Sequence, residues 1–380
     1  MIDHKPRYRL FLIFLLAAIY TFQCHAQDSL AFKLHGGLRF NYVYSTWDQD
    51  QKNQGGTIAY DVFRINPTAS YGNFTLDAEY RQYSSSFGGG FLKHGWIGYE
   101  FKDGEQLHVG LVSVPFGLQP VTGNSWFYNI GYYLGLEDNY DMGVRYSRQK
   151  ERWDYDFAFI KNAETLDLGG DTELSQSRFA YDIVGRNKKV NQVNANVVYK
   201  TTGAIQQQIG LSGQLGGLYN IDTKKMGNHY AASLAYQVDY STWNLKASFI
   251  HAIHNPMNAA GTSNQVMELG AYGSAYETAT NFHVYTVGLA KNFSVNWKPM
   301  QALVVYHDFG YMQKHVKSFE NSYMQVTGVR TNIGPIITYI DYATGLNHSW
   351  FGGNFVNDFS LGDPNAKRQS RFNINLGYYF

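Results

Sequence analysis

The stretch Phe372-Asn-Ile-Asn-Leu-Gly-Tyr-Tyr-Phe380 closes the chain and indicates its fold. Every second residue of this stretch is apolar, and the residues between them begin with Asn, Asn and Gly. Alternate side chains of a β-strand face opposite sides of the sheet. The stretch therefore predicts a final strand that is apolar on one face and polar on the other, and that ends on an aromatic residue.

The same two-residue alternation recurs along the chain, with charged residues on the polar face. In Phe74–Arg81 the apolar set opposes Thr75, Asp77, Glu79 and Arg81, and similar patterns occupy the segments 38–44, 153–159 and 243–249. So many charges cannot lie in a dry core without partners, but a water-filled lumen accommodates them. A final strand of this kind, ending in Phe380, also resembles the signal that the barrel assembly machinery of the bacterial outer membrane reads.

The expected connections between strands alternate between short polar turns and longer segments. Seven short turns and eight long loops predict about sixteen antiparallel strands with both chain ends on one side, as in outer-membrane barrels. The predicted fold is therefore all-β, a transmembrane antiparallel β-barrel of about sixteen strands. One domain spans residues 27–380, and the third long loop is expected near Gly117–Asn139.

The first 26 residues have the composition of a secretory signal peptide. Basic residues precede an apolar run from Leu10 to Ile19, and Ala26 ends a cleavage site. A membrane anchor is the alternative, but the run is shorter than the roughly 20 residues that a span needs. The leader contains Cys24, the only cysteine, so the mature chain is expected to lack disulfides, thiol catalysis and cysteine-bound metals.

Composition supports a membrane barrel and argues against other classes of protein. Aromatic residues make up 17% of the chain, which has 31 Tyr, 38 Gly and a mean hydropathy of −0.35. Aromatic girdles at both interfaces of a barrel account for such a content. Cleavage of the leader removes three basic residues and one acidic residue, so the net charge falls from +1 to −1. This balance predicts no nucleic-acid partner.

One segment suggests a family: Val109-Gly-Leu-Val-Ser-Val-Pro-Phe-Gly-Leu-Gln-Pro120. It resembles the strand-to-loop element of the phosphate-selective porin O and P family, and the run Leu136–Tyr146 is similar to that family's return strand. The resemblance implies a sixteen-stranded outer-membrane porin, a homotrimer, with the third loop folded into the lumen. Phosphate-selective members line the channel with Arg and Lys. Here no Lys or Arg stands between Pro115 and Val144, so the family name does not fix the solute.

Strand parity predicts which charged residues line the pore. The basic set is Arg39, Arg64, Arg81, Arg145 and Arg371, and the acidic set is Asp77, Glu79, Asp154 and Asp156. Charged rings set ion selectivity in a pore, so the arginines could form a ladder that guides anions. The alternative is an arginine–carboxylate network that braces the wall. All but Arg145 of the five arginines are expected on neighbouring strands once the barrel closes.

The third loop is the predicted constriction. Its candidate residues are Pro115, Phe116, Gly117, Trp126, Phe127, Tyr128, Tyr132, Tyr133, Glu137 and Asp138. The aromatic residues could narrow the pore or form an apolar slide for solutes. Alternatively, they pack the folded loop against the wall, and both roles are compatible.

The leading functional hypothesis is a channel for passive diffusion of small hydrophilic solutes or ions, anions such as phosphate included. The expected location is the outer membrane of a Gram-negative bacterium. The expected partners are membrane lipid, the assembly machinery, further copies of the chain and small solutes. No cofactor is expected, since the phosphate-binding, dinucleotide and zinc-protease motifs are absent. No metal is expected either, because His251 and His254 lack further ligands nearby.

Two other functions stay open at this point. A barrel with a plugged lumen could serve a structural or secretion-associated role. An outer-membrane hydrolase would need a converging Ser/His or Asp/His set, and nothing in the sequence marks one.

Overall fold

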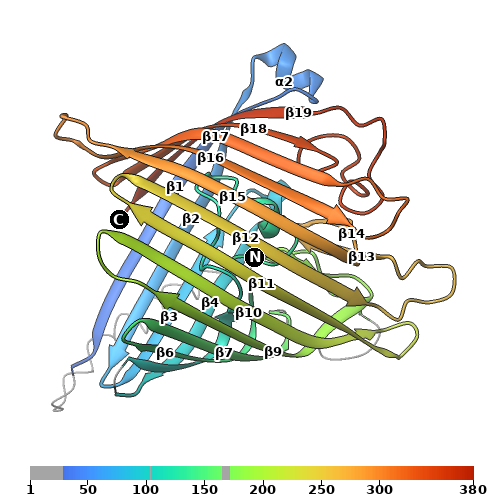
Figure 1. Cartoon of the computed structure of the whole chain (residues 1–380), viewed down its shortest axis with the longest axis horizontal. Helices are drawn as coiled ribbons and strands as arrows, with labels where there is room; N and C mark the ends of the chain where they lie inside the picture. Colours follow the sequence, from blue (N-terminus) through green and yellow to red (C-terminus); the bar gives the residue numbers. More distant parts are fainter. Residues whose placement is uncertain (1–28, 103, 165–171) are drawn as a thin grey trace, which may run out of the picture.

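The computed structural model describes residues 29–102, 104–164 and 172–380, so the expected leader (residues 1–26) lies outside the described residues. Sixteen antiparallel strands form one closed barrel (Figure 1), which confirms the predicted fold. The strands are β1 (Ala31–Ser45), β2 (Thr57–Tyr71), β3 (Phe74–Gln82), β4 (Gly90–Glu100), β5 (Glu105–Ser113), β6 (Tyr140–Lys150), β7 (Trp153–Asn162), β9 (Asn187–Lys200), β10 (Ile205–Asn220), β11 (Met226–Tyr240), β12 (Trp243–Asn255), β15 (Asn281–Phe293), β16 (Met300–Lys314), β17 (Ser322–Ile333), β18 (Ile336–Leu346) and β19 (Gln369–Tyr379).

The last strand closes the barrel against the first. β1 pairs with both β2 and β19, and Phe40 lies opposite Leu376 in the second ladder. Beyond β19, the Gly36 N–H donates to the Phe380 carbonyl (2.9 Å) and the Phe380 N–H donates back (3.1 Å). Closure of this kind leaves no unpaired strand edge, which an apolar surrounding would penalise.

The outer wall is apolar and the inner wall is polar, as the alternation predicts. Phe40 is 43% exposed and Phe157 is 46% exposed, although both are aromatic. On the opposite parity Arg81 is 6% exposed and Asn373 is fully buried. An apolar outer band around a polar interior is the arrangement of transmembrane barrels. Within the described residues, no helix combines the length and the apolar character needed to cross a membrane.

The two ends of the barrel differ in the length of their connections. At the short-turn end, pairs such as β2–β3 and β11–β12 are joined by two residues, and the start of β1 and the end of β19 lie there. The long-loop end carries the longer segments, among them residues 46–56 with helix α2 (Gln49–Gln54), which projects beyond the wall in Figure 1. The β10–β11 connection is short for this end, because the ladder between the two strands continues to the pair Tyr219–Met226.

Four of the long loops contribute buried apolar side chains to a core inside the barrel. We call them L3 (residues 114–139, with helix α3, Ile130–Tyr133), L4 (its described residues are 163–164 and 172–186, with β8, Asp182–Ile183), L6 (256–280, with β13, Val266–Ala271, and β14, Ser274–Ala279) and L8 (347–368). β14, β13 and β8 form a small sheet of their own. Buried apolar side chains of all four loops join one cluster, so the main hydrophobic core lies within the lumen.

A fifth long-loop connection, residues 83–89 between β3 and β4, reaches the same cluster through Tyr83 and Phe87. It contains the short 3-10 helix η1 (Ser85–Phe87).

Candidate functional site

L3 crosses the lumen and is anchored at its start on the wall formed by β9 and β10. The Gly117 N–H donates to Ser212 Oγ (2.8 Å), and the Gly117 carbonyl accepts from Asn196 Nδ2 (3.3 Å). Gly117 adopts φ +66°, a left-handed conformation that favours glycine. Pro115 and Phe116 are buried in the same turn. The Pro-Phe-Gly segment therefore directs the chain away from the wall and into the barrel.

The middle of L3 is held by two carboxylates on another part of the wall, formed by β16 and β18. Asp308 of β16 accepts from the backbone N–H groups of Asn124 (2.7 Å) and Ser125 (2.8 Å). Asp341 of β18 accepts from the Trp126 N–H at 3.3 Å. Hydrogen bonds to ionised acceptors are the stronger kind. These two acids were missed by the sequence reasoning, although both have the inward parity of their strands.

The two acids of L3 have different partners: Glu137 bonds within the loop, and Asp138 bonds to the neighbouring strands β6 and β4. Glu137 accepts from Thr122 Oγ1 (2.6 Å) and also contacts Asn129, and burial raises the pKa of Glu137 to about 7. Asp138 accepts from Tyr140 Oη (2.8 Å) and lies 3.4 Å from Lys93 Nζ. Both carboxylates are buried, and their bonds stabilise the C-terminal part of L3.

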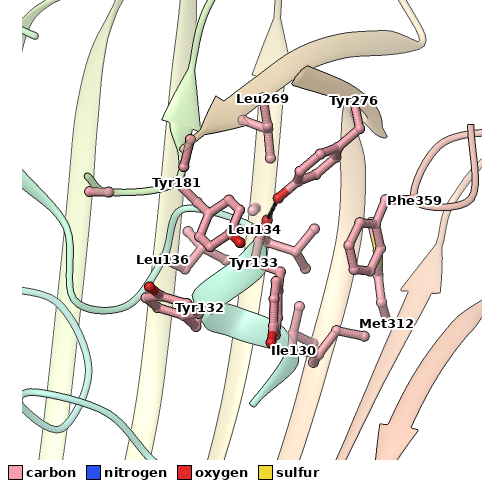
Figure 2. Packing of buried hydrophobic residues seen from close by; sticks show 14 of the residues in the cluster. Ile130, Tyr132, Tyr133, Leu134, Leu136, Tyr181, Leu269, Tyr276, Met312 and Phe359 are labelled. Atoms are coloured by element: carbon pink, nitrogen blue, oxygen red, sulfur yellow. Dashed lines mark hydrogen bonds between the residues drawn. The ribbon is translucent and has the colours of Figure 1, made fainter. Parts of the chain in front are cut away.

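The aromatic residues of L3 divide between packing and lining a cavity. Tyr132 Oη lies 2.9 Å from Tyr272 Oη, and Tyr276 donates to the Tyr133 carbonyl. Figure 2 shows these rings gathered around α3 with side chains of L4, L6 and L8. Trp126, Tyr128, Tyr132 and Tyr133 also line the cavity described below, as does Phe127.

Most of the predicted pore arginines are paired with carboxylates on the inner wall. Arg39 contacts Asp61 (2.9 Å), Arg81 contacts Glu79 (2.5 Å), Arg64 contacts Glu79 (3.5 Å) and Arg145 contacts Asp156 (2.6 Å). The remaining predicted acids also have partners. Asp77 accepts from Asn66 (2.8 Å) and lies 2.7 Å from His94 Nε2, and Asp154 pairs with Lys200.

Arg371 differs from the other four arginines. No carboxylate forms an ion pair with it among the residues that the structure describes. Its guanidinium lies over the rings of Phe127 (5.1 Å) and Trp126 (5.6 Å), and one N–H donates to Asn373 Oδ1 at 3.3 Å. The strands β19, β1, β2 and β3 are neighbours, as expected. Arg371 lies opposite Ser45, six residues along β1 from Arg39.

Between L3 and this wall lies a cavity of about 270 Å³, which we call the arginine cavity. Its lining includes three arginines and eleven aromatic side chains, Tyr60, Tyr83, Phe87, Trp126, Phe127, Tyr128, Tyr132, Tyr133, Tyr181, Tyr272 and Trp350. A second cavity of about 550 Å³ shares Arg371 and Trp350 and reaches Trp47 and Gln51 near the long-loop end. Arg371 therefore stands between the two spaces.

A third, more polar cavity of about 360 Å³ lies under L3, toward the short-turn end. Lys246, Arg330 and Asp239 line it together with Asn124 of L3. Arg330 was not among the predicted pore residues, although its position on β17 has inward parity.

L4 is fixed to the wall by a buried ionic cluster. Arg178 is 1% exposed and contacts Glu164 (2.9 Å), Asp141 (3.1 Å) and Asp182 (3.4 Å). Lys189 of β9 pairs with the same Asp141 and Asp182. The cluster joins L4 to β6 and β9. No local sequence pattern marks it, because its members come from four separate segments.

The two histidines weighed as metal ligands cannot share an ion. His251 and His254 lie three apart on β12, so one side chain faces outward and the other inward. In the described ranges, no group of three or more His, Cys, Asp or Glu residues is arranged to hold a metal.

Comparison with known proteins places the fold. No protein-family model matches the chain. No curated protein sequence matches it either. Among solved structures, the anion-selective porin from Comamonas acidovorans has a TM-score of 0.58 at 10% identity, covering 93% of this chain and 100% of that one.

Two further structures are similar at the same level. The outer-membrane channel DcaP of Acinetobacter baumannii has a TM-score of 0.58 at 10% identity, covering 94% of this chain and 99% of that one. The outer-membrane protein OmpT of Vibrio cholerae, in a trimer form, has a TM-score of 0.56 at 12% identity. The match covers 93% of this chain and 100% of that one. At these identities the likeness shows the fold, the sixteen-stranded barrel of outer-membrane porins.

Proposed function

We propose that the chain is a porin of the Gram-negative outer membrane, which lets small hydrophilic solutes or ions diffuse passively. The observation that carries this proposal is the closed ring of sixteen strands with an apolar outer face and a charged inner face. Such a wall separates lipid from water, and a barrel of this strand number is wide enough for an aqueous channel.

The proposed channel narrows at L3, and its ion preference is toward anions but weak. Arg39, Arg64, Arg81 and Arg145 share three carboxylates, because Arg64 and Arg81 both contact Glu79. They mainly brace the wall, and most of their charge is compensated. Arg371 lacks a carboxylate partner in the part of the chain that the structure describes, and it lines the arginine cavity. Because L3 carries no Lys or Arg, we do not expect strong selectivity for phosphate.

A second candidate function rests on the loop cluster. Aromatic side chains of L3, L4, L6 and L8 fill much of the long-loop half of the lumen. This packing favours a barrel whose lumen is closed, with a structural or secretion-associated role. Opening would then require that at least one loop leaves the cluster.

Three further expectations belong to the proposal. Residues 1–26 are removed as a signal peptide, Phe380 is read by the assembly machinery, and the barrel forms a homotrimer. The family resemblance of the segment Val109–Pro120 supports the trimer. The exposed position of Phe380 at the end of the closing strand supports the assembly role.

Reversal potential in planar bilayers tests the function. The purified barrel is placed in a salt gradient, first in chloride and then with added phosphate. We expect discrete conductance steps, a small shift toward the anion equilibrium potential and no block at low phosphate concentrations. A folded barrel that never produces steps would contradict the channel and favour the plugged alternative. Strong block at low phosphate would instead support a phosphate-selective pore.

A further inference from the structure

The walls of the arginine cavity limit what can occupy it. Aromatic rings from L3, L4, L6 and L8 and from the 83–89 connection surround the space. Flat ring faces favour a flat, partly apolar occupant, since stacked and edge-to-face aromatic contacts add to simple burial. A volume of about 270 Å³ is below the range of drug-sized ligands. It suits a molecule with a single ring.

The charge in this cavity is positive. Arg39 and Arg81 line it but are paired with Asp61 and Glu79. Arg371 has a buried Nε without a hydrogen-bond partner in the described part of the chain. Phe127 and Trp126 contact the flat face of its guanidinium, which leaves N–H groups at its edge. That edge is a planar fork of donors that matches a carboxylate.

We propose that the arginine cavity is a binding subsite for a monocyclic aromatic carboxylate. The carboxylate accepts hydrogen bonds from Arg371, and the ring lies among Tyr128, Tyr133 and Tyr181. This inference rests on the proposed function, because the solute reaches the subsite through the neighbouring 550 Å³ cavity, which shares Arg371. It deepens that function by naming a class of solute.

Other classes of solute match either the aromatic walls of the cavity or the charge of Arg371, but not both. Inorganic phosphate carries charge on all sides and needs several donors around it, whereas most of this wall is aromatic. A neutral sugar could stack on the rings, but it would leave the Arg371 charge without an anion. An aromatic carboxylate matches both features of the cavity. Its ring can contact the aromatic walls, and its carboxylate can pair with Arg371.

Ligand-observed saturation-transfer NMR on the refolded, full-length mature barrel tests the proposal, with benzoate as the probe. We expect saturable benzoate binding and no comparable binding of acetate or glucose, or of phosphate as measured by 31P line broadening. Arg371→Gln should weaken benzoate binding about tenfold or more, the size expected for loss of a charge-assisted pair. Arg371→Lys should recover part of the affinity.

Arg330→Gln is the matched control, because it removes a lumen charge from the separate 360 Å³ cavity. It should leave benzoate binding unchanged, and a heat-modifiability gel verifies that each variant is folded. Equal benzoate affinity in Arg371→Gln and the unaltered chain would overturn the proposal, as would phosphate binding as tight as benzoate binding. The NMR measurement detects binding whether or not the channel conducts. Channel steps without benzoate binding would therefore refute only the subsite. Benzoate binding without channel steps would refute the porin function instead.

Discussion

Arg178 is a deeply buried charge that several carboxylates surround. It is almost fully buried and has three carboxylates within 3.4 Å, two of them on L4. A buried ion pair contributes little net stability compared with apolar residues, but removal of one partner leaves a buried charge uncompensated. We therefore expect loss of Arg178 to weaken the packing of L4 inside the barrel.

Arg178→Met should detach L4. We expect a loss of roughly 3–5 kcal/mol in urea unfolding, or local unfolding of the loop with a larger and noisier conductance. Arg186→Met is the control, since Arg186 lies on the same loop but its pairs with Asp222 and Glu173 are exposed. Exposed pairs contribute about 0–1 kcal/mol. Equal effects of the two substitutions would show that the buried cluster does not hold L4.

Glu137 should make L3 sensitive to pH. Burial raises its pKa from an ordinary value of 4.5 to about 7, so the packed loop binds a proton more tightly than the released loop does. The resulting stabilisation is complete below pH 4.5 and is lost as the pH rises through 7. We expect quiet, small currents at pH 5 and larger or more frequent openings at pH 8.

Glu137→Gln mimics the protonated side chain and tests this assignment. Single-channel recordings of the variant between pH 5 and 8 should lose the part of the pH response that lies near pH 7. An unchanged pH response would assign it to other groups.

At the scale of elements, the strands could be predicted from the sequence and the loop anchors could not. Side-chain alternation is a local property of the sequence. The outer and inner faces of β3, β7 and β12 could therefore be predicted from their own residues. The bond between Asp308 and the Asn124 backbone joins residues 184 positions apart, and no local pattern encodes it. The resemblance around Pro115 predicted that the third loop enters the lumen, but it did not indicate which wall the loop reaches.

The same contrast holds for the predicted site. Parity grouped the five arginines on one face of their strands, because only the period of the strand is needed for that. It could not distinguish Arg39, which has Asp61 as a partner, from Arg371, which has aromatic neighbours instead. That difference depends on L3, whose position is set by contacts across the barrel.

Asp308→Asn should loosen L3. The amide keeps the shape of the carboxylate but loses the charge that strengthens its bonds to the Asn124 and Ser125 backbone. We expect larger conductance and more gating noise in bilayers. Asp239→Asn is the control, because the side-chain hydrogen bonds of this inward acid, among the residues that the structure describes, go to Gln237 and Asn244 near the short-turn end. If both variants conduct like the unaltered chain, Asp308 is not the tether of L3.

The whole molecule depends on closure between its first and last strands. Phe380 follows β19, is 57% exposed and bonds through its backbone to Gly36. Its side chain therefore adds little to the folded barrel, although it ends the strand that completes the ring.

Phe380→Ser should impair assembly in cells far more than it impairs the finished barrel. We expect a severalfold lower amount in the outer-membrane fraction. Refolding into detergent should proceed normally, with a change in unfolding free energy under about 1 kcal/mol, as for other exposed positions. Normal amounts in the membrane fraction would contradict the role of Phe380 as an assembly signal.

The central claim is that successive residues of each strand face lipid and water in turn, around a closed wall. Leu289 and Ala290 of β15 test it, since Leu289 is 43% exposed on the outer face and Ala290 lines the 360 Å³ cavity. Because Cys24 is the only cysteine, single cysteines can be introduced at both positions in a Cys24→Ser background.

Spin labels on these two cysteines, in barrels reconstituted into bilayers, give the most direct measurement. The collision rate with oxygen reports exposure to lipid, and the collision rate with a water-soluble nickel chelate reports exposure to water. The structure predicts oxygen dominance for Leu289→Cys and nickel dominance for Ala290→Cys. The reverse order, or lipid exposure at both positions, would contradict the barrel and the channel together.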